Sequence, residues 1–206
     1  MMETCKQEPQ NGFLTTEAYL PGQGTHGGQK AVEERFRDGQ DADELRRMRQ
    51  AAQNLLDTLK QQKLHISMAE SCTGGMMASA LVDLSGASDV FEEGYVTYSN
   101  RIKQKLLGVK SETLEQYTVV SGQTAAEMAE GVHDRTGAEL TIAVTGYAGP
   151  DDGEDGTPAG TVYIGTWYAG DTQSRHYHFA GDRNSCRRQA AEAAFTFALE
   201  RIRRSE

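Results

Sequence analysis

Three short segments of the sequence carry nucleophilic or basic side chains, and each lies at the end of a predicted β-strand. The first segment, Ala69-Glu-Ser-Cys-Thr-Gly-Gly75, places Ser71 and two further potential nucleophiles in a row ahead of a predicted helix. Gly74 and Gly75 allow the backbone to approach a ligand closely, and the free N–H groups at a helix start favour an anion or oxyanion. Small polar residues are also ordinary helix caps, so this segment alone does not establish an active site.

The second segment runs from Tyr95 to Lys105 and also passes from a strand end into a helix start. Tyr98 stands at the end of the strand, and Lys103 falls about one turn into the helix. A lysine in a partly desolvated cleft loses its proton more readily and then serves as a base toward a serine hydroxyl. The alternative interpretation is an exposed helix lysine.

The third segment is Val144-Thr-Gly-Tyr-Ala-Gly-Pro150, in which Thr145 offers a hydroxyl at a strand end. An acidic run, Asp151–Asp155, follows it. Carboxylate oxygens suit magnesium or calcium, but the spacing does not match an EF-hand loop. We interpret the run as a solvated turn and expect no metal site and no cofactor.

Hydrophobic periodicity predicts the elements that position these segments. Helices are predicted over residues 41–60, over 73–82, from an N-cap at Asn100, from an N-cap at Ser121, and over 184–204; strands are predicted over 64–69, 91–98, 140–144, 160–168 and 172–180. Strands that alternate with helices and end in a hairpin indicate an α/β fold. We expect a layered sandwich with a mixed, mostly parallel sheet flanked by helices and a late β-hairpin.

Composition limits the domain organisation and the classes of partner. The chain has 206 residues and a formal net charge of -9, and its mean hydropathy is -0.61. We predict a polar, disordered extension over residues 1–40 and one domain over 41–206. The acidic charge argues against direct nucleic-acid binding. Three dispersed cysteines, no secretory signal and no apolar span predict a cytoplasmic protein without a membrane anchor.

Several separated motifs, in order along the chain, closely resemble the CinA C-terminal domain family of nicotinamide-nucleotide amidases. The motifs are Ala69–Gly75, Gly94–Asn100, Leu106–Val109, Val144–Gly146 with Ala148–Pro150, and Pro158–Val162. The resemblance covers about Leu45 to Arg204. The large N-terminal domain of full-length CinA proteins is not in this sequence, so a stand-alone amidase domain is expected.

The resemblance implies hydrolysis of the carboxamide of nicotinamide mononucleotide to nicotinate mononucleotide and ammonia by a homodimer. It implies that Ser71 is the nucleophile, with Tyr98, Lys103 and Thr145 around it. The base is Lys103, acting directly or through Tyr98. The substrate-binding residues expected from these motifs are Glu70, Cys72, Thr73, Gly74, Gly75, Asn100, Gly146, Gly149 and Arg183, with Arg183 or Arg101 as phosphate ligand.

This sequence departs from the family pattern beside the expected pocket. Tyr147 replaces a smaller aliphatic residue, Asp151–Asp155 replaces a glycine-rich loop, and Thr157 replaces a lysine. These changes bear on substrate preference rather than on the fold. Two alternatives follow: an amidase for a different small amide, and a non-catalytic protein-binding module associated with competence or DNA damage.

Overall fold

The computed structural model describes residues 39–204, which form one α/β unit. The predicted disorder of residues 1–40 falls almost entirely outside the described residues. The first described element is helix α2 (Gly39–Gln62), which starts two residues before the predicted helix. No helix within residues 39–204 is both long enough and apolar enough to cross a membrane.

A five-stranded mixed sheet forms the centre of the unit, in the order β2-β1-β3-β4-β5. The strands are β1 (Ile66–Glu70), β2 (Phe91–Val96), β3 (Leu140–Gly146), β4 (Thr161–Tyr168) and β5 (Asp171–His178). β1 pairs in parallel with β2 and β3, whereas β4 is antiparallel to both of its neighbours. Four strands therefore point one way, and β4–β5 is the expected hairpin.

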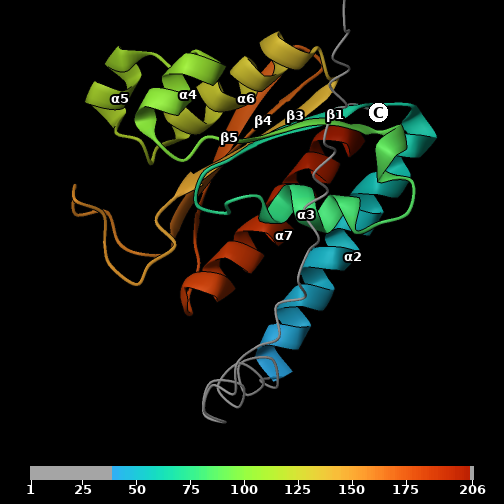
Figure 1. Ribbon diagram of the computed structural model, residues 1–206, viewed down its shortest axis with the longest axis horizontal. Helices are drawn as coiled ribbons and strands as arrows, with labels where there is room; N and C mark the ends of the chain where they lie inside the picture. The colour runs from blue at the N-terminus through green and yellow to red at the C-terminus, as the bar shows by residue number, and fades with distance from the viewer. Residues whose placement is uncertain (1–38, 205–206) are drawn as a thin grey trace, which may run out of the picture. The chain divides into compact units, whose positions relative to one another are not determined.

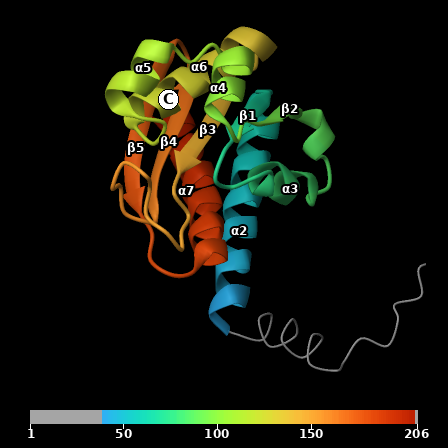
Figure 2. The ribbon, with the colours of Figure 1, turned by 60° about the vertical axis from the view of Figure 1, so that its left-hand side comes forward.

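Helices cover both faces of the sheet (Figures 1 and 2). One face carries α2, α3 (Met76–Val82) and α7 (Arg183–Arg203), and a short 3-10 helix (Ala87–Asp89) leads into β2. The other face carries α4 (Asn100–Leu107), α5 (Ser111–Tyr117) and α6 (Gly122–Thr136). This layering confirms the predicted fold class.

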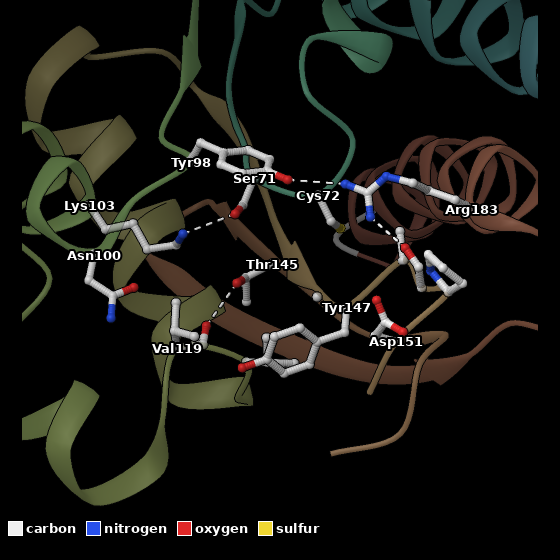
Figure 3. A pocket seen from close by; sticks show the side chains of 15 residues that line it. Ser71, Cys72, Tyr98, Asn100, Lys103, Val119, Thr145, Tyr147, Asp151 and Arg183 are labelled. Atoms are coloured by element: carbon white, nitrogen blue, oxygen red, sulfur yellow. Dashed lines mark hydrogen bonds between the residues drawn. The ribbon is translucent and has the colours of Figure 1, made fainter. Parts of the chain in front are cut away.

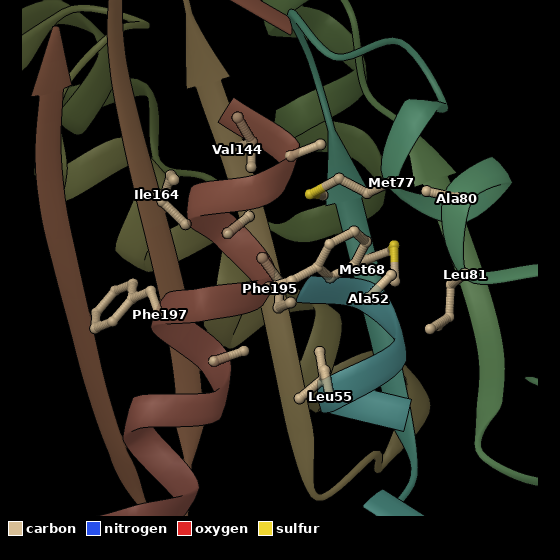
Figure 4. Close-up of a cluster of buried hydrophobic side chains, with 14 of the residues drawn as sticks. Ala52, Leu55, Met68, Met77, Ala80, Leu81, Val144, Ile164, Phe195 and Phe197 are labelled. Carbon is tan, nitrogen blue, oxygen red and sulfur yellow. The ribbon is translucent and has the colours of Figure 1, made fainter. Parts of the chain in front are cut away.

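The larger hydrophobic core lies between the sheet and the helices α2 and α7 (Figure 4). Leu55 and Leu59 of α2 and Phe195 of α7 are fully buried there, against Met68 and Ile164 of the sheet. Each such side chain contributes about 1.5–3 kcal/mol through removal of its apolar surface from water. This packing anchors one face of the sheet to α2 and α7.

Two further details differ from the sequence-based expectations. The N-cap of α4 is Ser99, whose hydroxyl accepts from the Ile102 amide, so the predicted cap at Asn100 was wrong by one residue. Helix α5 was not predicted. By contrast, Ser121 caps α6 as expected, with its hydroxyl accepting from the Thr124 amide.

Candidate active site

A cavity of about 320 Å³ lies at the edge of the sheet where β1, β2 and β3 end (Figure 3). Parallel strands present their carboxyl ends at the same edge, which is where open α/β sheets bind ligands. Ser71 follows β1, Tyr98 follows β2, and Thr145 lies near the end of β3. Together with Lys103, these residues line the cavity, so the structure brings all four predicted catalytic side chains together.

A direct hydrogen bond joins Lys103 and Ser71 in the cavity. Lys103 Nζ donates to Ser71 Oγ at 3.0 Å and to the Thr97 carbonyl oxygen at 2.9 Å. The Lys103 side chain is fully buried, and this desolvation lowers its pKa from 10.5 to about 8. A sizeable fraction of the amine is therefore neutral near pH 8 and able to accept a proton from the serine.

Helix α4 aims Lys103 inward because of the local sequence. The Ser99 cap starts the helix directly after the β2 end, so residue 103 falls on the second half of the first turn. Leu107, four residues later, shares the buried face and packs into the smaller core on that side of the sheet. Lys103 thus occupies a core-facing position of an amphipathic helix.

Cys72 is adjacent to Ser71 but is a poor nucleophile. The residue is 5% exposed, and burial raises the pKa of its thiol to about 12. Because the thiolate is the reactive form of cysteine, this side chain stays protonated and unreactive at neutral pH. The environment therefore favours Ser71 over its neighbour.

Tyr98 is joined to Arg183 rather than to Lys103. Arg183 Nη2 donates to the Tyr98 hydroxyl at 3.1 Å, and Nη1 donates to the Gly149 carbonyl oxygen at 2.6 Å. Figure 3 shows both interactions across the mouth of the cavity. Because Lys103 contacts Ser71 without an intermediary, the geometry favours the direct-base alternative over a relay through Tyr98.

The hydroxyl of Thr145 makes a structural hydrogen bond rather than a contact with Ser71 or Lys103. Its side chain is 1% exposed, and its hydroxyl donates to the Val119 carbonyl oxygen at 2.8 Å. This bond ties the end of β3 to the segment that precedes α6. Thr145 therefore helps to hold the part of the cavity wall that the end of β3 forms.

Four of the predicted substrate-binding residues do not line the cavity: Glu70, Thr73, Gly74 and Gly75. The Glu70 carboxylate is 1% exposed and accepts from the amides of Gly75, Met77 and Ala78 at 2.8–3.1 Å. A buried carboxylate at the start of α3 satisfies amides that have no partner within the helix. Glu70 is therefore a helix cap rather than a ligand-binding group.

The other predicted binding residues, which are Cys72, Asn100, Gly146, Gly149 and Arg183, do line the cavity. The lining also includes Val119 and Val120, which sequence reasoning missed. These two valines lie in the short connection between α5 and α6, and no polar pattern marked them. Only their spatial proximity to β3 reveals their place in the wall.

The acidic run after Pro150 makes hydrogen bonds within its own loop. Asp152 accepts from the Ala159 amide, and Asp155 accepts from the Thr157 amide, so both carboxylates stabilise the loop itself. Among residues 39–204, no group of three or more His, Cys, Asp or Glu side chains is arranged to hold a metal ion. Asp151, by contrast, lines the cavity.

The fold and site define an α/β protein with a buried serine–lysine pair in a cavity at the sheet edge. Residues 48–202 match the family model described as "CinA C-terminal domain". The chain therefore belongs to the CinA family, as its motifs predicted.

Relatives and solved structures agree with this assignment. The chain is 48% identical over 139 residues to a putative competence-damage inducible protein of Clostridium novyi, and 44% identical over 151 residues to a CinA-like protein of Kosmotoga olearia. These matches cover 68% and 73% of this chain but only 33% and 36% of the relatives, so the chain spans about a third of their length.

Crystal structures of CinA superfamily proteins have the same architecture. One from Escherichia coli has a TM-score of 0.72 at 39% identity, covering 74% of this chain and 88% of that one. Another, from Klebsiella pneumoniae, has a TM-score of 0.74 at 34% identity, covering 76% of this chain and 98% of that one.

Proposed function

We propose that this protein is a serine amidohydrolase that hydrolyses the carboxamide of nicotinamide mononucleotide to nicotinate mononucleotide and ammonia. The observation that carries the proposal is the 3.0 Å contact between Lys103 Nζ and Ser71 Oγ, with the pKa of Lys103 lowered to about 8. A serine hydroxyl needs an adjacent base to attack an amide, and a desolvated lysine is such a base.

The proposed reaction has two halves. Ser71 Oγ attacks the amide carbon as Lys103 takes the serine proton, and Lys103 then returns that proton to the departing nitrogen, which leaves as ammonia. Water next attacks the resulting ester, giving one proton to Lys103. Lys103 passes that proton back to Ser71 Oγ as the carboxylic acid is released. Each half returns the lysine to its neutral state.

The tetrahedral oxyanion needs fixed donors close to Ser71. The amides of Gly74 and Gly75 already donate to the Ser71 carbonyl and to Glu70. The Cys72 and Thr73 amides make no hydrogen bond to another residue within the described part of the chain. We assign the oxyanion to the Cys72 amide, because Cys72 directly follows the nucleophile and lines the cavity.

Arg183 is the proposed ligand for the substrate phosphate. It lies at the mouth of the cavity, and two of its five N–H groups are committed to Gly149 and Tyr98. The remaining donors suit a phosphate, which guanidinium groups bind with two parallel hydrogen bonds. A cavity of about 320 Å³ lies at the small end of the range of about 300–1,000 Å³ found for ligand sites.

The test is release of ammonia from nicotinamide mononucleotide by the purified protein. We expect Ser71→Ala to abolish release and Cys72→Ala to retain it, since the neighbouring thiol is buried and protonated. Release by Ser71→Ala at the wild-type rate would overturn the serine assignment. No release by the wild-type protein above the Ser71→Ala level would instead favour another small amide or a protein-binding role.

A further inference from the structure

Arg187 of α7 contacts the loop that carries the nucleophile, although the two are far apart in the sequence. Its Nη2 donates to the Thr73 carbonyl oxygen at 2.7 Å, across a separation of 114 residues, and its Nη1 donates to Asn184 Oδ1 at 3.2 Å. The guanidinium also lies against the Gly74 backbone, where a Cβ would be 3.5 Å from Nη2. The proposed reaction leaves this arginine without a role.

The positive charge of Arg187 is directed at the backbone of this loop. Both of its hydrogen-bond partners are uncharged oxygen atoms, whereas Arg188 and Arg201 of the same helix contact carboxylates. Burial raises the pKa of the Cys72 thiol to about 12, and the charges of Lys103 and Arg187 act in the opposite direction. The field of Arg187 therefore extends to the residue that follows the nucleophile.

Two peptide groups connect Arg187 to the amide that we assign to the oxyanion. The Thr73 carbonyl, which accepts from Arg187, shares its peptide group with the Gly74 N–H. That N–H donates to the Ser71 carbonyl oxygen at 3.1 Å. The Ser71 carbonyl in turn shares its peptide group with the Cys72 N–H. Because a peptide group is one conjugated unit, a donor at its oxygen makes its N–H a stronger donor.

We propose that Arg187 polarises the oxyanion site through these two peptide groups and so accelerates attack by Ser71. We call this hydrogen-bonded series, from the guanidinium to the Cys72 N–H, the peptide relay. Hydrogen bonds in a chain strengthen one another by about 10–30% per bond, and a charged donor is roughly twice as strong as a neutral one. The inference rests on the proposed acylation of Ser71. Arg187 does not line the cavity, so it is a positioning residue.

The test separates the charge at position 187 from its hydrogen bond. Arg187→Lys keeps the charge, Arg187→Gln keeps a neutral donor, and Arg187→Met keeps neither. With nicotinamide mononucleotide as substrate, we expect kcat to be nearly retained in the first variant, reduced in the second, and about tenfold lower in the third. Tenfold is a fraction of the roughly 10²–10³ lost when a whole oxyanion donor is removed.

Two further readouts distinguish polarisation from a merely structural role. KM should stay constant in all three variants, because Arg187 does not line the cavity. The midpoint of the pH profile should stay near pH 8 in Arg187→Gln, because burial is the main cause of the lowered pKa of Lys103. The thermal unfolding temperature of each variant establishes that it is folded.

A second probe, 4-nitrophenyl acetate, makes the test independent of the amide substrate. Ser71 Oγ forms a bond to the carbonyl carbon of this activated ester, Lys103 takes the serine proton, and the bond to the departing 4-nitrophenolate breaks. We expect the release of 4-nitrophenolate, corrected for the Ser71→Ala background, to fall about tenfold in Arg187→Met.

The matched control is Asn184→Ala. It removes the other partner of the guanidinium and leaves the contact with the Thr73 carbonyl. We expect its rates with both compounds to lie within about twofold of the wild type, as for most exposed substitutions.

The peptide relay and the amidase proposal fail in different ways. Equal rates of ammonia release by the wild type and Arg187→Met would overturn the relay and keep the amidase. A loss that appears in KM rather than kcat, or that is as large in Arg187→Lys as in Arg187→Met, would also overturn the relay. Ester cleavage that depends on Ser71 and Arg187, without ammonia release, would overturn the amidase and keep the relay. No Ser71-dependent reaction with either compound would overturn both.

Discussion

In the proposed mechanism, Lys103 determines how activity varies with pH, because only its neutral form accepts the Ser71 proton. Burial lowers its pKa to about 8, so the fraction of neutral amine rises about tenfold per pH unit below 8 and levels off above it. We expect kcat/KM for amide hydrolysis to follow this curve. The measurement is a pH–rate profile between pH 6 and 10, and a profile that is flat through pH 8 would contradict the base assignment.

The same burial has a cost in stability, which Lys103→Met should reveal. The fall in the pKa of Lys103 from 10.5 to about 8 means that the folded protein at pH 7 is destabilised by about 3 kcal/mol through the burial of the charged amine. Removing the amine eliminates this cost but leaves the Thr97 carbonyl without its donor, at about 1–3 kcal/mol. We therefore expect an inactive variant whose free energy of unfolding at pH 7 lies within about 1–2 kcal/mol of the wild type.

The direction in which stability changes with pH tests whether the pKa of Lys103 is lowered in the folded protein. Between pH 8 and 10.5 the unfolded wild-type chain binds a proton at Lys103 that the folded chain does not, so wild-type stability rises with pH from this group. Relative to Lys103→Met, the wild type should gain about 2–3 kcal/mol between pH 7 and 10. Urea unfolding of both proteins at pH 7 and pH 10 measures this gain. If the difference in free energy of unfolding between the two proteins were the same at both pH values, the lowered pKa of Lys103 would be contradicted.

At the scale of single residues, the sequence predicted the four central side chains because each stands at a strand end or on the following helix turn. Glu70 was predicted to bind substrate from its place in the motif. The structure shows its carboxylate accepting from the amides of Gly75, Met77 and Ala78 at the start of α3. Residues whose role depends on contacts distant in sequence, such as Val119, gave no local signal.

Among the elements, the crossing of α4 and α6 controls where Lys103 lies. Gly131 of α6 lies against the Leu107 carbonyl of α4, and a Cβ at this position would clash with that backbone oxygen. Gly131→Ala should therefore destabilise the protein by about 1–3 kcal/mol, although alanine is ordinarily favoured over glycine within helices. Thermal or urea unfolding measures the change.

The matched control is Glu130→Ala, which alters the adjacent exposed residue of the same helix. This substitution should change the free energy of unfolding by no more than about 0.5 kcal/mol. If Gly131→Ala were as stable as that control, the close contact between Gly131 of α6 and the Leu107 carbonyl of α4 would be contradicted.

Element boundaries were predictable where capping and periodicity agreed, and less so elsewhere. Ser121 and the apolar stripe of α6 indicate the same helix start, and the structure confirms it. At the start of α4, the neighbours Ser99 and Asn100 are both favourable N-cap residues. The residue types alone therefore do not show which of the two caps the helix. Helix α5 has seven residues and one buried side chain, Thr113, so it carries no apolar stripe for the sequence to reveal.

Across the whole molecule, a buried ionic cluster joins the first described helix to the last. Arg188 of α7 contacts Glu44 at 2.8 Å and also Asp41, both on α2, and Glu44 is 2% exposed. Glu44→Ala would leave the buried guanidinium with less compensation, and such losses cost about 3–5 kcal/mol. We expect a correspondingly large fall in the urea midpoint.

An exposed ion pair between the same two helices provides the comparison. Arg47 contacts Glu192 at 3.2 Å, with the arginine side chain 54% exposed. Arg47→Ala should cost less than about 1 kcal/mol, because solvent screens the pair. Equal losses for Glu44→Ala and Arg47→Ala would show that burial does not strengthen the first contact.

The contact between Ser71 and Lys103 also has a consequence for how this chain can change over generations. Without Ser71, Lys103 would keep its desolvation cost and lose the partner that makes the buried amine useful. A descendant that lost the serine could then exchange the lysine for an apolar residue at little cost in stability, because the relief of desolvation offsets the loss of the donor to the Thr97 carbonyl. We therefore expect these positions, 32 residues apart, to be inherited as a pair and lost as a pair.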